Sequence, residues 1–268
     1  MNPADVEALA EAVLEGARYR YMDQALMRSL AEKELSKGRS FKEAVKAVRN
    51  KLHQVGGAFQ EQTPPYARWV MELKELADDP TDPQVRAFCL GAMQAHSSTR
   101  ERSPILERFY QETLTPLGKI NSVLDLACGL NPLALNWMPL ATGATYHAVD
   151  IYQDLADFLN HFFAHMHING QAGLCDLTAA VPPQPVQLAL LLKTIPCLEQ
   201  VDSLAGVRLL GSIPAEHILV SFPMHSLSGH SKGMRANYEA HFNELIAGQN
   251  WRVQRFEYSS ELAFLLSR

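Results

Sequence analysis

The chain has 268 residues, 47% of them hydrophobic and 20% charged, which is typical of a globular protein with one large or two modest domains. Its net charge of −5 argues against a general nucleic-acid binder, and no apolar run approaches the ~20 residues that a membrane span needs. The N-terminus lacks the basic and apolar regions of a signal peptide, so we expect a cytoplasmic protein.

The first part of the chain is predicted to be helical throughout. Apolar residues recur with a 3.6-residue period over 6–14 and 41–52. Ser40 fits the N-cap of the second stretch, and Glu43 three residues on completes a capping box. Pro64-Pro65 then begins a further helix. We therefore expect a helical N-terminal domain over residues 1–95 and a second domain over 96–268.

Positive charge is concentrated within this helical region. Between residues 17 and 51 there are ten basic residues against four acidic ones, a local excess of +6 in a chain that is acidic elsewhere. Such a run is either a solvated helix face or a surface for a polyanion.

A dense polar run, His96-Ser97-Ser98-Thr99-Arg100-Glu101-Arg102, follows the helical region. Ser103 before Pro104 could start a helix that carries the arginines in solvent. Alternatively, one arginine could clamp a carboxylate, which a planar guanidinium does well. The spacing alone leaves both interpretations open.

Residues 122–132, Ser-Val-Leu-Asp-Leu-Ala-Cys-Gly-Leu-Asn-Pro, are the most informative stretch. An apolar strand with Asp125 just inside its end breaks on a small-residue turn. A strand that ends at a glycine turn and opens a helix brings backbone N–H groups to a ligand, as open α/β sheets do for nucleotide-like cofactors. The absence of a full G-x-G-x-x-G argues against a dinucleotide.

From Val123 onward, short apolar strands alternate with helices. Helical stretches between the first five strands favour a parallel sheet with right-handed crossovers. Only Ser259-Ser260-Glu261 separates the last two, which should form an antiparallel hairpin at a sheet edge. That ending is typical of Rossmann-like methyltransferases. The predicted strands are 122–126, 145–149, 171–174, 188–192, 217–221, 251–258 and 263–266.

Three residues at successive strand ends suit S-adenosylmethionine. Gly129 supplies a turn under the methionine tail, Asp150 ends the second strand where an acid meets ribose hydroxyls, and Asp176 follows the third strand, placed for the adenine amino group. Each aspartate alone could be an N-cap or turn residue. As an ordered set they predict a site for this cofactor.

The segments after the fourth and fifth strands bear on the methyl acceptor. Leu192-Lys193-Thr194-Ile195-Pro196 lacks the Asn/Asp-Pro-Pro-Tyr/Phe motif of many amino-methyltransferases, which favours an acceptor that is already nucleophilic. The Gly/Ser-rich segment 221–234 is either a flexible surface loop or a substrate loop. In the second case Phe222 could stack on a base, and Lys232 and Arg235 could meet phosphates.

Cysteine and histidine spacing predicts neither a metal site nor a disulfide framework. The four cysteines are widely spaced and include no C-x-x-C pair. On a helix, His161 and His165 would share a face, but His167 would point elsewhere. We expect no bound metal.

Several segments together resemble one family, the aminoglycoside-resistance 16S ribosomal RNA methyltransferases that modify N7 of guanine 1405 in the decoding site. The most specific are Asp-x-Ala-Cys-Gly-x-Asn-Pro from Asp125 and Ser-Phe-Pro…Lys-Gly-Met…Asn-Tyr from Ser221. The loop departs from the family at His230 and Arg235, where an arginine is lost and a charge is reversed. The other matching segments are 51–59, 96–102 and 190–193.

The resemblance implies a Rossmann-like S-adenosylmethionine-dependent methyltransferase domain and a helical domain that docks on the 30S subunit. In the cofactor site, Arg102 would hold the carboxylate and Asp150 the ribose. The implied cofactor residues are His96, Ser97, Ser98, Arg102, Gly129, Asp150, Ile151, Cys175, Asp176, Leu177 and Lys193. The implied RNA-binding residues are Arg18, Arg20, Lys42, Lys46, Arg49, Lys51, Lys232 and Arg235.

Guanine N7 carries a free lone pair, so methyl transfer to it needs in-line placement and exclusion of water, and no general base. The target base would be flipped out of folded RNA and positioned by Lys193, Phe222 and Lys232. Two alternatives remain at this point: a non-catalytic protein that binds cofactor and RNA, and a small-molecule methyltransferase with a helical lid. A monomer is the default expectation.

Overall fold

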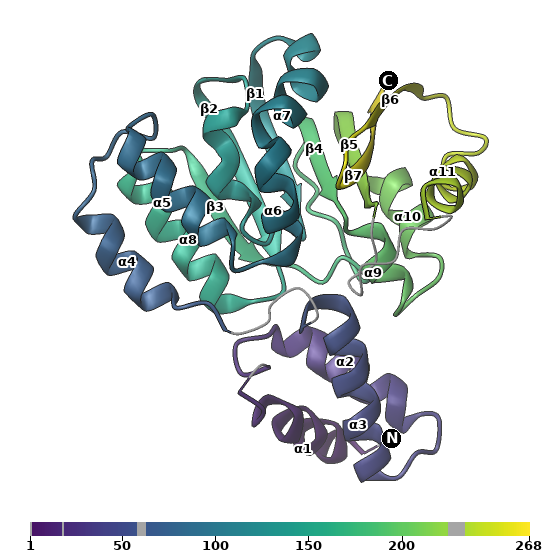
Figure 1. Cartoon of the computed structure of the whole chain (residues 1–268). Helices are drawn as coiled ribbons and strands as arrows, with labels where there is room; N and C mark the ends of the chain where they lie inside the picture. The colour runs from purple at the N-terminus through teal and green to yellow at the C-terminus, as the bar shows by residue number, and fades with distance from the viewer. Residues whose placement is uncertain (1, 18, 58–62, 225–233) are drawn as a thin grey trace.

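The computed structural model describes residues 2–17, 19–57, 63–224 and 234–268. Its first three helices, α1 (Pro3–Leu14), α2 (Gln24–Leu35) and α3 (Phe41–Leu52), pack on one another, and a short π-helical turn, His53–Gly57, follows α3. Figure 1 shows these helices together below the sheet, apart from the other helices. We call α1, α2 and α3 the three-helix unit.

Local sequence accounts for much of this unit. The predicted capping box is confirmed, because Glu43 Oε2 accepts a hydrogen bond from the Ser40 backbone N–H at 3.0 Å. Leu9 and Val48 are fully buried between the helices, as the apolar periodicity predicts. Phe41, the first residue of α3 and expected on the same apolar face, is instead 47% exposed.

Four further helices belong spatially with the sheet. They are α4 (Tyr66–Lys74), α5 (Pro83–Met93), α6 (Ser97–Arg102) and α7 (Leu106–Leu114).

Helix α4 packs against α8 (Gln153–His165), a helix of the sheet layer. The Phe158 ring of α8 lies 5.3 Å from Tyr66 and 5.5 Å from Trp69, both of α4 (centroid distances). The spatial division of the chain therefore falls between the end of α3 and the start of α4, upstream of residue 95.

The sheet has seven strands in the order β3-β2-β1-β4-β5-β7-β6, with β1 to β5 parallel and β7 antiparallel to both of its neighbours. Every predicted strand is present, and the predicted antiparallel hairpin at the edge is confirmed. The strands are β1 (Ile120–Leu126), β2 (Leu140–Asp150), β3 (Gly170–Leu174), β4 (Val186–Leu192), β5 (Ala215–Pro223), β6 (Arg252–Glu257) and β7 (Glu261–Ser267).

Two connections differ from the predicted alternation of strand and α-helix. Between β1 and β2 the chain forms only a 3-10 helix, Asn131–Trp137. Between β3 and β4, residues 175–185 contain no helix. Pro182, Pro183 and Pro185 explain the second case, because proline lacks an N–H and disfavours helical geometry in the residue before it.

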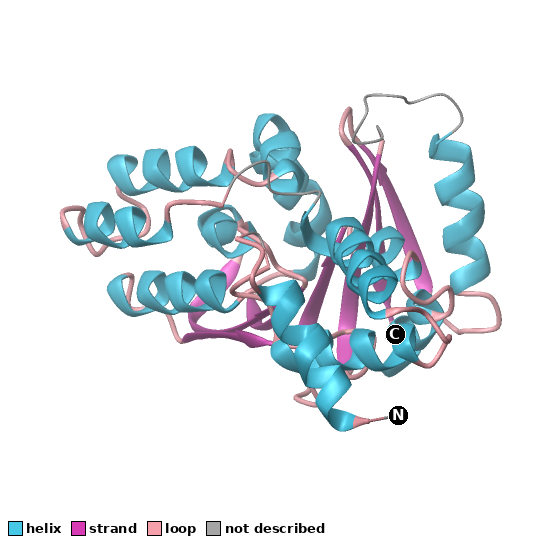
Figure 2. Ribbon diagram, turned by 90° about the horizontal axis from the view of Figure 1, so that it is seen from below, coloured by secondary structure: helices cyan, strands magenta, loops and turns pink. Residues whose placement is uncertain are grey.

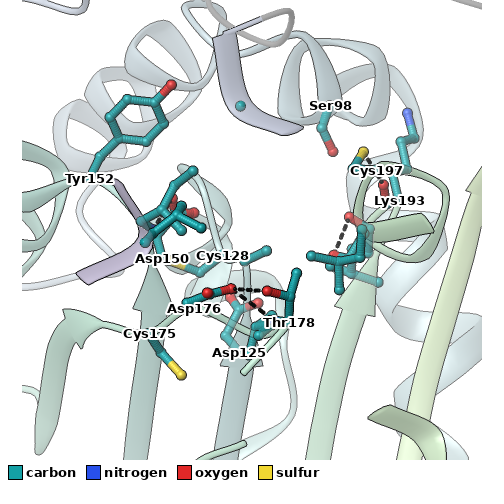
Figure 3. Close-up of a pocket in the computed structure, with 18 of the residues that line it drawn as sticks. Ser98, Asp125, Cys128, Asp150, Tyr152, Cys175, Asp176, Thr178, Lys193 and Cys197 are labelled. Carbon is teal, nitrogen blue, oxygen red and sulfur yellow. Dashed lines mark hydrogen bonds between the residues drawn. The ribbon is translucent and has the colours of Figure 1, made fainter. Parts of the chain in front are cut away.

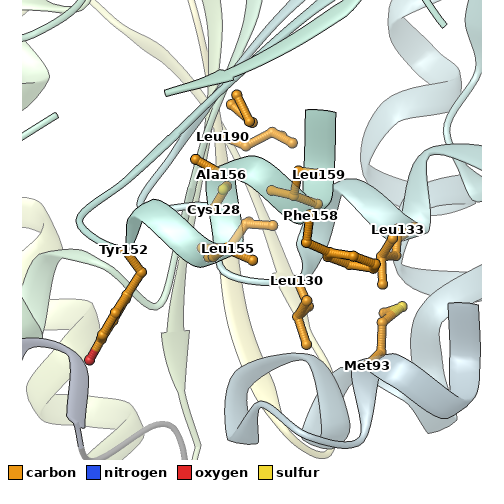
Figure 4. Close-up of a cluster of buried hydrophobic side chains, with 14 of the residues drawn as sticks. Met93, Cys128, Leu130, Leu133, Tyr152, Leu155, Ala156, Phe158, Leu159 and Leu190 are labelled. Carbon is orange, nitrogen blue, oxygen red and sulfur yellow. The ribbon is translucent and has the colours of Figure 1, made fainter. Parts of the chain in front are cut away.

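Helices cover both faces of the sheet, as Figure 2 shows. On one face lie α9 (Ile195–Glu199), α10 (Ala205–Ser212) and α11 (Met234–Leu245), packed on the alternate apolar residues of β4 and β5. On the other lies the larger core, part of which Figure 4 shows, with Leu155, Phe158 and Leu159 of α8. Within the described residues, no helix has the length and apolar character needed to cross a membrane.

Candidate functional site

A cavity lies at the carboxyl ends of the parallel strands, where Figure 3 shows strand-end residues converging. This is the edge at which open α/β sheets bind ligands. Most of the predicted cofactor residues line it, whereas Ser97 and Gly129 do not. The predicted residues that line it are His96, Ser98, Arg102, Asp150, Ile151, Cys175, Asp176, Leu177 and Lys193.

The turn after β1 and the end of β2 are joined by the Asp150 carboxylate. Its Oδ2 accepts a hydrogen bond from the Gly129 N–H at 2.8 Å, and its Oδ1 accepts one from the Ile151 N–H at 2.7 Å. Burial raises the pKa of Asp150, and these backbone hydrogen bonds partly offset that rise. The carboxylate is thus fixed in orientation at the cavity wall.

Position 129 requires glycine for two reasons. Its φ is +49°, in the left-handed region, and a Cβ there would lie 3.1 Å from Cε1 of His96. The backbone therefore passes close under the His96 ring. Burial, together with the charges of Arg102 and Lys193, lowers the pKa of His96 to about 4, so this imidazole is neutral at physiological pH.

Asp176 forms the turn that was its alternative interpretation, and it also lines the cavity. Its Oδ1 accepts hydrogen bonds from the Thr178 N–H at 2.8 Å and from the Thr178 hydroxyl at 2.7 Å. This Asx turn holds the segment after β3 against the cavity, which both Asp176 and Thr178 line.

Arg102 lines the cavity, but its guanidinium is engaged within the protein. Its Nε lies 2.7 Å from Glu261 Oε1, and its Nη2 donates to Glu261 Oε2 at 3.2 Å. Its Nη1 donates to Asn131 Oδ1 at 3.0 Å, and both charged side chains are fully buried. A cofactor carboxylate would therefore meet a guanidinium already neutralised by Glu261. The clamp role of Arg102 stays a prediction.

Glu261 was missed by the sequence interpretation, which placed it in a hairpin turn. The structure makes it the first residue of β7, with no exposed surface. A sequence signal did exist: an acid directly preceding the apolar run Leu-Ala-Phe-Leu-Leu is either a turn residue or a buried charge with a partner.

A buried polar network centres on Asn131, which lines the cavity together with Asp125. Its Oδ1 also accepts from the Tyr110 hydroxyl at 2.6 Å, and its Nδ2 donates to Asp125 Oδ2 at 2.9 Å. The Tyr146 hydroxyl donates to the same Asp125 oxygen at 2.7 Å. Burial outweighs these hydrogen bonds and raises the pKa of Asp125 to about 7.

Lys193 lies on the opposite side of the cavity, directly after β4. It is 4% exposed, with Nζ 2.6 Å from Glu101 Oε2 and 3.5 Å from Glu261 Oε1. Its φ is +60° and that of Ala127 is +51°, both rare for residues with a side chain. Two of the three non-glycine residues with positive φ in the described chain thus lie in the cavity lining.

The prediction that Phe222 stacks on the target base is wrong for this structure. Phe222 is fully buried in the core under α11, and its ring centroid lies 5.1 Å from that of Tyr238 and 6.2 Å from those of Phe242 and Phe264. Alternation along β5 decides this, because the strand turns Phe222 toward the helices on that face.

The predicted RNA-binding residues of the three-helix unit differ in accessibility. Arg20, Lys42 and Lys46 are exposed, whereas Arg18 lies outside the described residues.

Arg49 and Lys51 have structural partners instead of free side chains. Nη2 of Arg49 donates to the Ala12 carbonyl oxygen at 2.6 Å, and Nζ of Lys51 lies 2.8 Å from Glu34 Oε1. Both side chains are partly buried and help to hold α1, α2 and α3 together, and their role as phosphate contacts stays a prediction.

The remaining two predicted RNA contacts follow β5. Lys232 lies outside the described residues, and Arg235, at the start of α11, is exposed and pairs with Glu257 at 3.1 Å.

The fold and the site together define a Rossmann-like methyltransferase. The evidence is the strand order, the antiparallel β7, and an acid at the end of β2 that accepts a hydrogen bond from the glycine turn after β1. A family model described as "Ribosomal RNA methyltransferase (FmrO)" matches residues 15–265. The chain belongs to this family.

Curated relatives are similar over nearly the whole chain. A 16S rRNA (guanine(1405)-N(7))-methyltransferase of Micromonospora echinospora is 35% identical over 98% of this chain and 97% of its own length. One of Serratia marcescens is 31% identical over 96% of both.

Solved structures show the same fold. The 16S rRNA methylase RmtB superposes with a TM-score of 0.81 at 26% identity, covering 98% of each chain. The methyltransferase RmtF, in complex with S-adenosyl-L-homocysteine, also gives a TM-score of 0.81, at 31% identity, covering 100% of this chain and 99% of its own.

Proposed function

We propose that this protein transfers a methyl group from S-adenosylmethionine to N7 of guanine 1405 of 16S rRNA, and thereby confers aminoglycoside resistance. The observation that carries the proposal is family membership together with full-length similarity to relatives that bear this activity in their names. The strand-end cavity supports it, since it holds the acids that the cofactor needs.

The cavity residues fit S-adenosylmethionine by their chemistry. Asp150, with its orientation fixed by two backbone N–H groups, would accept hydrogen bonds from the ribose hydroxyls. Asp176, beside the partly buried Cys175 and the buried Leu177, would face the adenine. His96, Ser98 and the Gly129 turn would surround the methionine end, with Arg102 nearest its carboxylate. The bound cofactor supplies a methyl group on a positively charged sulfur.

The chain has little chemistry to add beyond binding and placement. Guanine N7 attacks through its own lone pair, so no residue has to remove a proton. Lys193 lies at the cavity with its ammonium held by Glu101, where it would contact the target nucleotide. Lys232 would assist it, and the buried walls would exclude water.

The substrate would be the assembled 30S subunit, bound by the three-helix unit. Arg20, Lys42 and Lys46 are exposed there and free to meet phosphates, which supply most of the affinity of such complexes. The protein would act as a monomer on cytoplasmic ribosomes and flip the target base out of the folded RNA.

The test is to incubate the protein with 30S subunits and labelled S-adenosylmethionine, then map the modified base by borohydride and aniline cleavage and reverse transcription. We expect label on 30S subunits and one strand break at guanine 1405. Subunits carrying adenine at that position, and an Asp150→Ala variant, serve as controls and should stay unlabelled. Cofactor binding without label on 30S would refute the proposal.

A further inference from the structure

The cavity at the strand ends has a wall that the cofactor prediction did not include. Besides the strand-end residues, it is lined by Leu26 and Leu30 of α2 and by Leu52 of α3. These leucines are 5%, 1% and 0% exposed, so they face the interior and not solvent. The three-helix unit therefore contributes side chains to the same cavity as Asp150 and Asp176.

The two parts of the chain meet immediately beside Asp150. The Asp23 N–H, at the N-cap of α2, donates to the Ile151 carbonyl at 2.8 Å, and the Gln153 N–H donates to the Tyr21 carbonyl at 2.7 Å. These bonds form a short antiparallel bridge between the segment before α2 and the segment after β2. The unit is thus joined to the sheet at the cavity itself.

A second contact lies at the π-helical turn after α3. A Cβ on Gly56 would lie 2.8 Å from the Tyr152 hydroxyl oxygen, and the turn also packs against α9. Leu198 of α9 and Val201 line the cavity as well. Apolar side chains of α2, α3 and the α9 segment therefore meet around one space.

Such a wall suits one part of the cofactor. Asp150 and Asp176 provide polar partners for the ribose and the adenine edge, but the flat faces of the adenosyl group are apolar and gain from leaving water. We propose that Leu26, Leu30 and Leu52 form an apolar wall of the cofactor site, so that the helices that dock on the 30S subunit also hold the adenosyl group.

This arrangement would couple cofactor binding to binding of the 30S subunit. A ligand that contacts both α2 and the sheet favours the arrangement in which they are closed on one another, and α3 carries the exposed Lys42 and Lys46. If the closed arrangement docks, the cofactor tightens 30S binding and the 30S subunit tightens cofactor binding by the same factor. This second part rests on the proposed function, whereas the apolar wall does not.

Calorimetry of the whole protein with S-adenosylhomocysteine tests the wall without RNA. We expect Leu30→Ala and Leu26→Ala each to weaken binding about 5- to 20-fold, the loss expected for removing part of a leucine contact. Leu9→Ala is the matched control, because Leu9 is equally buried in the three-helix unit and does not line the cavity. Its affinity should stay within about twofold of wild type.

Two results would overturn the proposed apolar wall. One is unchanged S-adenosylhomocysteine affinity in folded Leu26→Ala or Leu30→Ala, and the other is an equal loss of that affinity in Leu9→Ala. Leu30→Met keeps the volume and should retain binding, which separates loss of contact from loss of fold.

For the linkage, 30S affinity is measured with and without saturating S-adenosylhomocysteine. We expect tighter binding with it, and a smaller difference in Leu30→Ala. No difference in wild type would overturn the linkage, whereas failure of the proposed function would appear separately as unmethylated guanine 1405.

Discussion

The surroundings of two buried carboxylates in this protein shift their pKa values in opposite directions. Glu34 is buried in the three-helix unit and meets three cations: Lys37 at 2.7 Å, Arg39 at 3.0 Å and Lys51 at 2.8 Å. Burial alone would raise its pKa, but hydrogen bonds and charges from Lys37 and Lys51 outweigh burial and lower the pKa to about 2. Asp125, hydrogen-bonded only by neutral donors, has a pKa of about 7.

Replacing Glu34 by glutamine should destabilise the protein most at neutral pH. The folded pKa of about 2 lies below the ordinary value of 4.5, so the contribution of Glu34 is present above pH 4.5 and is lost as the pH falls toward 2. We expect Glu34→Gln to lower the free energy of unfolding by roughly 2 kcal/mol at pH 7. Urea unfolding at a series of pH values measures this. A difference that stays constant down to pH 2.5 would contradict it.

Asp125→Asn should have the opposite pH dependence. The folded pKa of about 7 lies above the ordinary 3.8, so the stability that the neutral acid contributes is present below pH 3.8 and is lost as the pH rises through 7. Both hydrogen bonds reach the same oxygen, Oδ2, which an asparagine oxygen can replace. Relative to wild type, the variant should gain roughly 1 kcal/mol per pH unit over this range. The same difference in unfolding free energy between variant and wild type at pH 5 and at pH 7 would exclude such a shift.

At the scale of elements, the β5–β7 pairing connects the functional edge to the far end of the chain. β7 pairs with β5 over its full length and brings Glu261 to Arg102 and Lys193. The same strands carry Phe222 and Phe264 into the core under α11, where Phe264 stacks on Phe242 with ring centroids 3.8 Å apart. A strand that builds the polar site on one face thus builds an aromatic core on the other.

Phe222→Leu therefore tests a packing role against a base-stacking role. Loss of ring contacts in a filled core should lower the free energy of unfolding by about 1–2 kcal/mol. Affinity for 30S subunits should stay within about twofold of wild type, since the ring is fully buried. Chemical denaturation and a filter-binding assay give the two values. A large loss of 30S affinity at unchanged stability would restore the stacking interpretation.

At the scale of the molecule, an acidic chain carries exposed basic side chains close together on one helix. The net charge is −5, yet the exposed lysines Lys42 and Lys46 lie together on α3. A polyanion is attracted by the charges nearest to it and not by the net charge of the whole chain, so a protein with negative net charge can bind RNA.

Reversal of both lysines should weaken 30S binding and flatten its salt dependence. For Lys42→Glu with Lys46→Glu, we expect the slope of log affinity against log salt to shrink by about 1.5–2, because two phosphate contacts are lost. Cofactor affinity should be unchanged. Lys119→Glu is the matched control, an exposed lysine beside the start of β1, at the end of the sheet opposite the cavity. Lys119→Glu changes the net charge by −2 and the double variant changes it by −4, so an effect half as large in Lys119→Glu would show that net charge alone is responsible.

The sequence by itself determined the strands, the edge hairpin, the capping box and the set of Gly129, Asp150 and Asp176. The strands, the hairpin and the capping box depend on short-range periodicity and turn chemistry, which are local properties, whereas the set of three follows from the general rule that parallel strands end at one edge of a sheet. Only the tertiary structure decided that Phe222 is buried, that Glu261 neutralises Arg102 and that leucines of α2 and α3 reach the cavity at the strand ends. Each of these contacts joins residues far apart in the chain. The sequence around a residue does not reveal which distant residue will bury it or pair with it.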